Sequence, residues 1–151
     1  MNTSYSFESS ARWTGGQQGV VAGRDVKPSI NFSAPPEFHG QEGIWTPEHF
    51  FTSAVATCFV TTFQAIAAYS KFEAHALEAS VEGQVEKTEG GFQFTRVTIR
   101  PLLAINCESD RERGLRLLEK AEKACLVSRS LQSQIVLEPQ AVLATPVATP
   151  V

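Results

Sequence analysis

The most pronounced hydrophobic pattern in the chain covers residues 50–70, which hold no charged side chain. Apolar and neutral residues recur there at spacings of three and four, which is the period of one helix face. Thr46, Pro47 and Glu48 are typical of a helix start, with a capping hydroxyl, a proline in the first turn and an acid near the positive end of the dipole. We predict a helix of about 23 residues that is apolar nearly all round, so the rest of the domain or a second subunit must cover it.

The segment before this helix predicts a small antiparallel sheet. Polar and apolar residues alternate over residues 4–13, and further short strands are expected at 19–22 and 29–32. Glycine-rich turns separate these strands. Pro35 and Pro36 end the third strand, because proline cannot donate a hydrogen bond to a ladder.

The segment after the helix predicts a hairpin, a second helix and a last strand. Residues 77–86 and 92–99 alternate on either side of a Glu-Gly-Gly turn. The second helix begins after Ser109, which together with Glu112 has the spacing of a capping box. A last short strand is expected at 135–137. Strands, a long helix, a hairpin, a second helix and a final strand together predict an α+β fold.

Length and composition narrow the possible functions. The chain has 151 residues, so we expect one domain over residues 1–138, followed by a proline-rich C-terminal tail over 139–151. Thirteen Lys and Arg residues against sixteen Asp and Glu residues give a net charge of −3, which argues against nucleic-acid binding through phosphate neutralisation. No uninterrupted apolar run approaches the roughly 18 residues of a membrane span, and the first residues lack the order of a signal peptide. We therefore expect a cytoplasmic protein that binds neither nucleic acid nor membrane.

The chain has three cysteines, Cys58, Cys107 and Cys125, at wide spacings. An odd number in a cytoplasmic protein argues against structural disulfides, and no Cys and His spacing is typical of a metal site. Buried structural thiols and a small number of reactive thiols both remain possible. We expect Cys58 in the middle of the long helix, Cys125 on the buried face of the second helix, and Cys107 as a buried structural thiol at a strand end.

Each of the two helical cysteines lies in a distinct motif. Cys58 follows Glu48 of the Thr-Pro-Glu element by ten residues (58 − 48 = 10), and Cys125 heads a Cys-x-x-Ser segment with Ser128. Together with the glycine-rich first turn, these motifs resemble those of the OsmC/Ohr family of thiol-dependent peroxidases. The resemblance spans nearly all of residues 5–137. The matching blocks are residues 13–16, 36–40, 46–59 and 123–131.

The resemblance implies an OsmC-like fold, in which antiparallel sheets surround long central helices, and an intertwined homodimer with two active sites at its interface. Cys58 would be the peroxidatic thiol, which attacks an organic hydroperoxide and becomes a sulfenic acid. Cys125 would resolve that acid to a disulfide, which an external dithiol reduces. The resemblance implies no cofactor and no metal. Apolar residues around Cys58 favour alkyl or fatty-acid peroxides as substrates.

The chain departs from the family at the cation expected beside the first cysteine. A cysteine among apolar side chains has a raised pKa, so a thiolate there requires a cation or several hydrogen-bond donors. In the Ohr branch this cation is an arginine of the glycine-rich loop, held by the glutamate of the Pro-Glu element, but this chain has Gln17 and Gln18 at that place. Arg24 is the nearest candidate for the role, with Glu48 as the carboxylate that holds its guanidinium. Arg129 is a second candidate, and plain surface charge is the alternative for both.

Two functions therefore remain open. The first is a thiol-dependent peroxidase that reduces organic hydroperoxides through a peroxidatic and a resolving cysteine. The second is an OsmC-like dimer with weak or no peroxidase activity that acts as a stress-related binding protein, which the replacement by Gln17 and Gln18 favours. Glu48 likewise has a simpler role, as an acid in the first turn of a helix.

Overall fold

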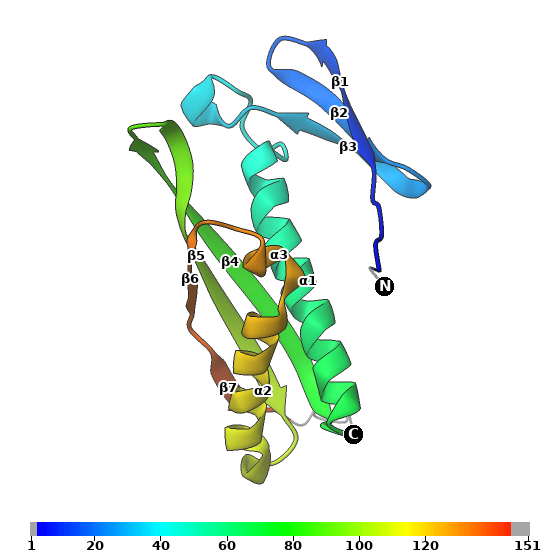
Figure 1. The fold of residues 1–151 in the computed structure, drawn as a ribbon, viewed down its shortest axis with the longest axis vertical. Helices are drawn as coiled ribbons and strands as arrows, with labels where there is room; N and C mark the ends of the chain where they lie inside the picture. The colour runs from blue at the N-terminus through cyan, green and yellow to red at the C-terminus, as the bar shows by residue number, and fades with distance from the viewer. Residues whose placement is uncertain (1–2, 146–151) are drawn as a thin grey trace, which may run out of the picture. The chain divides into compact units, whose positions relative to one another are not determined.

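The elements confirm the predicted α+β class. The computed structural model describes residues 3–145, which cluster in two compact units divided between Phe51 and Thr52. Figure 1 shows the elements in chain order: β1 (Ser9–Gly15), β2 (Gln18–Gly23), β3 (Val26–Ser33), η1 (Pro36–Phe38), α1 (Pro47–Tyr69), β4 (Ala74–Thr88), β5 (Gly91–Ile105), η2 (Glu108–Asp110), α2 (Arg111–Ala124), α3 (Leu126–Arg129), β6 (Gln134–Leu137) and β7 (Gln140–Leu143).

The first unit is an antiparallel sheet in the order β1-β2-β3. Its first turn passes through Gly15 and Gly16, both at positive φ, where glycine is the least strained residue. The first strand begins at Ser9, later than the sequence predicted, and every residue of β1 is exposed. Trp13 is 76% and Val26 63% exposed. Three strands with so little burial are not stable alone, so this sheet needs a covering surface.

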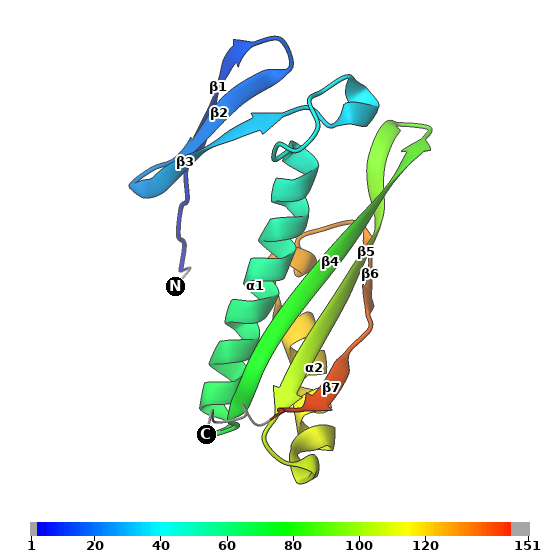
Figure 2. The ribbon, with the colours of Figure 1, turned by 180° about the vertical axis from the view of Figure 1, so that it is seen from behind.

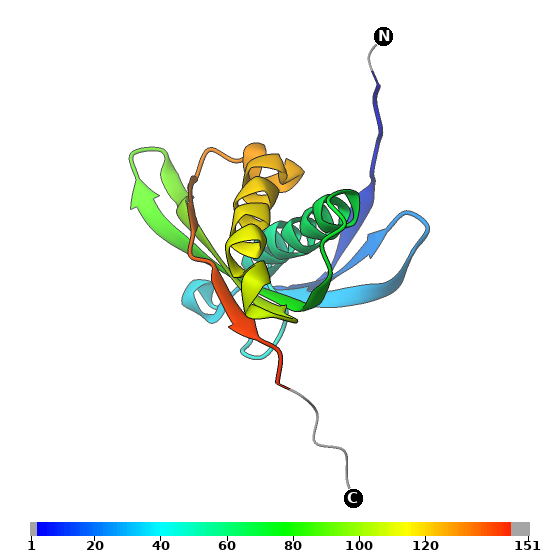
Figure 3. The ribbon, with the colours of Figure 1, turned by 90° about the horizontal axis from the view of Figure 1, so that it is seen from below.

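The second unit is a sheet in which β5 pairs with β4 antiparallel and with β6 and β7 parallel. Figures 2 and 3 show α1 and α2 on the same side of this sheet. Burial along β5 alternates from Ile99 to Ile105, as expected for a strand with one face covered by helices, but not over the predicted residues 92–99, where Val97, Thr98 and Ile99 are buried in succession. The core is formed by apolar side chains of α1, β5 and α2: Val55, Phe59, Phe63, Val97, Ile99, Leu103, Ile105, Leu117, Leu118 and Ala121.

Helix α1 begins as predicted but is covered on one face alone. The Thr46 hydroxyl accepts a hydrogen bond from the His49 N–H at 3.1 Å, which caps the first turn. By length and composition α1 could span a membrane, because an 18-residue window has a mean hydropathy of 1.5. Polar residues interrupt every apolar run of this segment, which predicts no membrane span, but most of them are threonine, which lowers the mean hydropathy only slightly. Only 22% of the window is buried within the chain.

Two further predictions are wrong at the C-terminal side. Residues 139–151 are not wholly a tail, since β7 pairs with β5 and the Ala144 N–H donates to the Ile105 carbonyl at 2.8 Å. The last six residues of that predicted tail, 146–151, lie outside the described residues. The capping box before α2 does not form, because Ser109 lies within η2 and Asp110 becomes the N-cap without a side-chain hydrogen bond.

Candidate functional site: a pair of thiols

Cys58 and Cys125 meet where the chain breaks between α2 and α3. Cys58 lies in the middle of α1 and is half-buried, whereas Cys125 is fully buried. Cys125 ends α2 and precedes α3 with an extended backbone, at φ −60° and ψ 113°. Both thiols are free and hydrogen-bonded to one another. Packing of α2 beside α1 thus brings together two cysteines that are far apart in sequence.

The surroundings of Cys58 favour its thiolate. Burial raises the pKa of this thiol, but four hydrogen bonds together bring the pKa below its ordinary value. The backbone N–H of Val127 contributes most, followed by the Cys125 thiol, the Thr62 hydroxyl and the backbone N–H of Leu126. The two N–H groups are available because the first N–H groups of a helix have no partner within it. The break at Cys125 therefore supplies donors that an unbroken helix would lack.

The surroundings of Cys125 have the opposite effect. Burial raises the pKa of this thiol, and its neighbour Cys58 raises it further. The side chain and the backbone N–H of Ser128 lower the pKa only in part. One cysteine is thus favoured as thiolate and its neighbour as thiol, and such a separation of two titrating groups is typical of an acid and base pair. The pair combines a nucleophilic sulfur with a neighbouring thiol that can later react with it.

The structure does not join Arg24 to Glu48. The Arg24 guanidinium pairs with the Glu8 carboxylate at 3.3 Å, and these side chains are 71% and 64% exposed. Glu48 Oε2 is buried and has no hydrogen-bond partner among the described residues. The ten residues from Glu48 to Cys58 span about 15 Å of helix, so the two cannot touch along α1. Arg129 is exposed in α3. Roles for Arg24 and Glu48 at the thiol pair stay predictions.

Three contributors to the site were not predicted from the sequence. Thr62 Oγ1 lies 3.9 Å from Cys58 Sγ. Its spacing of four residues from Cys58 on a predicted helix was a usable signal, since such residues are neighbours on a helix surface. Leu126 and Val127 act through their backbones, so their side chains carry no signal. Only knowledge of the helix break at Cys125 would have identified them.

The matching family model, described as OsmC-like protein, covers residues 40–140. The chain belongs to this family. The resemblance noted from the cysteine motifs is thereby confirmed. Two curated relatives span most of this OsmC-like chain. The Uncharacterized protein YmaD of Bacillus subtilis is 26% identical over 140 residues, which cover 91% of this chain and 93% of YmaD. The Organic hydroperoxide resistance protein of Xanthomonas axonopodis pv. citri is 27% identical over 132 residues, or 85% and 89% of the two chains.

The fold of this OsmC-like chain also matches a solved structure. An OsmC-like protein of unknown function from Vibrio cholerae superposes with a TM-score of 0.81 at 18% sequence identity. The match covers 90% of this chain and 99% of that one. At this identity the likeness concerns the fold alone, and it confirms the predicted OsmC-like architecture.

The third cysteine of the OsmC-like chain corrects a sequence prediction. Cys107 is exposed, with its Sγ 3.2 Å from both Ser109 Oγ and Asp110 Oδ2. It had been expected to be buried at a strand end. Because β5 ends at Ile105, position 107 lies beyond the ladder, where its side chain reaches solvent. Within residues 3–145, no group of three or more His, Cys, Asp or Glu side chains could hold a metal ion.

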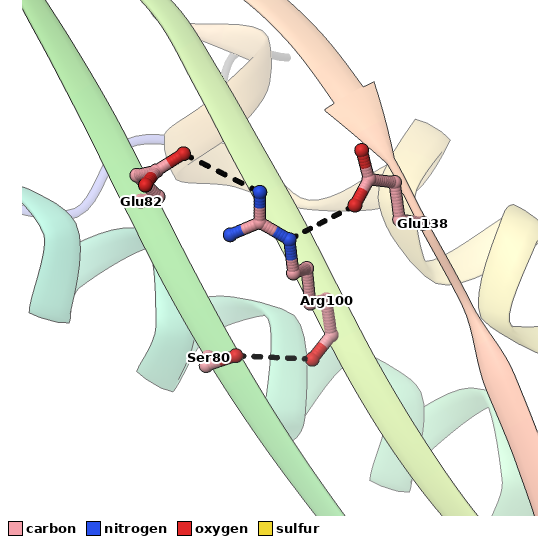
Figure 4. A network of polar contacts seen from close by, with 4 residues as sticks. All are labelled: Ser80, Glu82, Arg100 and Glu138. Carbon is pink, nitrogen blue, oxygen red and sulfur yellow. Dashed lines mark hydrogen bonds and ion pairs between the residues drawn. The ribbon is translucent and has the colours of Figure 1, made fainter.

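A polar network joins neighbouring strands of the second unit's sheet. Figure 4 shows Arg100 between Glu138, 2.9 Å from its Nε, and Glu82, 3.3 Å from its Nη2. These carboxylates raise the pKa of Arg100, in that order. The Ser80 hydroxyl donates to the Arg100 carbonyl at 3.5 Å. The network borders a hollow of about 480 Å³. It links β4, β5 and the residue after β6, which is a structural role.

Proposed function

We propose that this OsmC-like protein is a thiol-dependent peroxidase that reduces organic hydroperoxides. The observation that supports the proposal is the contact between Cys58 and Cys125, with their pKa values moved in opposite directions. Peroxide reduction by cysteine needs a thiolate as nucleophile and a second thiol within reach of the oxidised sulfur. Cys58 fits the peroxidatic role and Cys125 the resolving role.

The proposed reaction has two steps at sulfur and one reduction. The Cys58 thiolate attacks the terminal oxygen of the hydroperoxide, so that an S–O bond forms and the O–O bond breaks. Sulfur becomes a sulfenic acid, and the departing alkoxide takes a proton to give an alcohol. Cys125 then attacks the Cys58 sulfur, an S–S bond forms, and the hydroxyl leaves as water with the Cys125 proton. An external dithiol reduces this disulfide through two exchanges and is itself oxidised to a disulfide.

The substrate class follows from the surroundings of Cys58 and from one relative. Val55, one turn before Cys58 on α1, is a buried apolar side chain, and an apolar environment favours an alkyl peroxide over hydrogen peroxide. The name of the Xanthomonas relative refers to organic hydroperoxide resistance. We expect an alkyl or fatty-acid hydroperoxide as substrate and the cytoplasm, where dithiol reductants are abundant, as the place of action.

We also propose that the protein acts as a homodimer. The outer face of α1 is exposed at Thr57, Thr61, Ala65 and Ala68. A hollow of about 300 Å³, lined by Ala56, Thr57, Val60, Thr61 and Ala79, lies on α1 and β4. The sheet of the first unit likewise leaves apolar side chains uncovered. Exposed apolar surface of this extent marks an interface, and a second copy of the chain would cover both surfaces.

A steady-state assay with cumene hydroperoxide and a dithiol tests the proposed activity. The wild-type protein is expected to turn over, Cys58→Ser to be inactive, and Cys107→Ser to match wild type, because Cys107 lies outside the thiol pair. The Cys107→Ser variant controls for the loss of a thiol as such. An inactive wild-type protein, or a Cys58→Ser variant that keeps its activity, would contradict the proposal.

The second candidate function is a stress-related binding protein with weak or no peroxidase activity. Two observations favour it. Arg24 is paired with Glu8, and no arginine is among the groups that shift the pKa of Cys58. A hollow of about 730 Å³ in the first unit, bordered by Trp45 and His49, has the size of a small-molecule site. An inactive wild-type protein in the assay would place this function first.

A further inference from the structure

Three threonines of α1 lie within five residues of Cys58 and use their hydroxyl groups differently. The Thr57 hydroxyl donates to the carbonyl of Ser53 at 2.8 Å. The Thr61 hydroxyl donates to the carbonyl of Thr57 at 3.0 Å. Such bonds to the preceding turn are the usual use of a threonine hydroxyl within a helix. The Thr62 hydroxyl instead contacts a side chain, with its Oγ1 3.9 Å from the sulfur of Cys58.

The position of Thr62 suits it to hold this sulfur. Four residues along a helix bring side chains to the same face one turn apart. Thr62 is half-buried, as Cys58 is, so the contact is partly shielded from solvent. A hydroxyl can also rotate, so it donates to a thiolate and accepts from a thiol. Hydrogen bonds to reacting groups are often long in the resting enzyme and shorten when charge develops.

The other donors to Cys58 are fixed to the backbone. The N–H groups of Leu126 and Val127 reach the sulfur from the start of α3, and the Cys125 thiol reaches it from the end of α2. Cys125 is itself a reacting group, because its sulfur bonds to Cys58 when the disulfide forms. Thr62 is the side-chain donor among these partners that forms no bond to sulfur in the proposed cycle.

We propose that Thr62 is a positioning residue of the peroxidatic cysteine: its hydroxyl donates a hydrogen bond to the Cys58 thiolate and, with the N–H groups of Leu126 and Val127, holds the negative charge through neutral donors. This inference rests on the proposed function only in naming Cys58 as the peroxidatic residue. A hydrogen bond to a charged acceptor is stronger than one between neutral groups, so loss of the hydroxyl weakens the thiolate more than the thiol.

The test is the pH dependence of Cys58 alkylation by iodoacetamide, followed by peptide mass spectrometry in a Cys107→Ser background. Thr62→Val keeps the shape of the side chain and removes its hydroxyl. We expect it to move the midpoint of the rate curve upward by about one pH unit, which lowers the thiolate fraction below the midpoint about tenfold. Thr62→Ser restores the hydroxyl and is expected to return the midpoint to the wild-type value.

Thr61→Val is the matched control, because it removes a hydroxyl from the adjacent position that bonds only to backbone carbonyls. Its midpoint is expected to equal that of the parent. An unchanged midpoint in Thr62→Val, or an equal change in Thr61→Val, overturns the inference. If circular dichroism shows that Thr62→Val does not fold, Thr62→Ala takes its place, because it removes the same hydroxyl without adding a valine side chain. Its alkylation midpoint is then compared with that of the parent.

The alkylation experiment separates this inference from the proposed function. Iodoacetamide reads the thiolate without any peroxide. A chain that is inactive with cumene hydroperoxide but has the expected midpoints contradicts the peroxidase and supports Thr62 as donor. A chain that is active, with a midpoint indifferent to Thr62→Val, leaves the peroxidase standing and overturns the role of Thr62.

Discussion

Two thiols of the same chemical type have opposite protonation preferences in this molecule because their partners differ. Cys58 accepts hydrogen bonds from several donors, while Cys125 is fully buried and lies beside the charge that Cys58 develops. No ionic group is required for this difference. Backbone N–H groups at a helix start carry partial positive charge, and they act at short range. The reactivity of a cysteine is thus set by a few neighbouring atoms.

The first prediction at this scale concerns pH. Because only the thiolate attacks peroxide and the donors lower the pKa of Cys58, its reaction rate should rise with pH through a midpoint below the ordinary pKa of a cysteine. Cys125→Ala removes one donor and should move that midpoint upward. Single-turnover peroxide consumption, measured across the neutral range, checks both expectations. A wild-type midpoint at or above the ordinary value would refute the thiolate assignment.

The second prediction at this scale concerns Arg24. If the Arg24 guanidinium assists Cys58 in the active protein, it must leave its ion pair with Glu8. That pair is exposed to solvent and therefore contributes little to stability. Arg24→Ala is then expected to slow the reaction with peroxide at least tenfold, or about 1.4 kcal/mol in barrier. Glu8→Ala breaks the same ion pair, keeps the guanidinium, and should leave the rate unchanged. Equal rates in all three proteins would make Arg24 a surface charge.

At the scale of elements, the important feature is the break between α2 and α3. It ends one helix at Ala124 and begins another at Leu126, with Cys125 between them in an extended conformation. Three consecutive residues thereby present a thiol and two N–H groups to α1. Close packing supports this arrangement, since a Cβ at Gly114 would lie 2.8 Å from a Leu103 methyl group on β5. A bulkier residue there would force the Leu103 side chain to move.

The prediction at this scale is a disulfide between the elements. Peroxide treatment is expected to form a bond between Cys58 and Cys125 of one chain, because each thiol is a hydrogen-bond partner of the other. A bridge requires their Cα atoms to lie about 4.4–6.8 Å apart. Peptide mapping under non-reducing conditions should recover this pair, with Cys107 alkylated and unpaired. Recovery of Cys107 in the bridge would reverse the assigned roles.

At the scale of the whole molecule, the apolar surface exceeds what one chain covers. The second unit has its own core, but α1 is buried on one face alone. The first unit has an exposed sheet with large apolar side chains. A membrane could cover α1 by length and composition, whereas a second copy of the chain would cover α1 and the sheet together.

The prediction at this scale is an obligate homodimer with an interface above about 2,000 Å². Sedimentation at micromolar concentration should give the mass of two chains. Ala65→Glu places a charge on the exposed face of α1, where its desolvation would be costly, and is expected to give monomers. Lys120→Glu, on the exposed side of α2, changes charge without touching that face and should remain dimeric. A monomeric wild-type protein would contradict the dimer.

Much of the fold was accessible from the sequence because its signals are local. The helical spacing of apolar residues in α1 and its Thr46 cap depend on residues within one or two helical turns of each other. The alternation of polar and apolar residues in the hairpin depends on residues two positions apart. The same holds for the spacing between Glu48 and Cys58. The family resemblance and the two candidate cysteines followed from such local patterns, and the family match over residues 40–140 confirms the resemblance.

The tertiary structure decided which of these residues meet. Cys58 and Cys125 are 67 positions apart (125 − 58 = 67), and only the packing of α1, α2 and β5 brings their sulfur atoms together. The N–H groups of Leu126 and Val127 became donors because α2 ends at Ala124, and β7 exists because β5 offers it a parallel edge. Local periodicity sets the type of an element and the face it buries, but long-range packing sets its neighbours. The chemistry of the thiol pair therefore depends on contacts that no local pattern encodes.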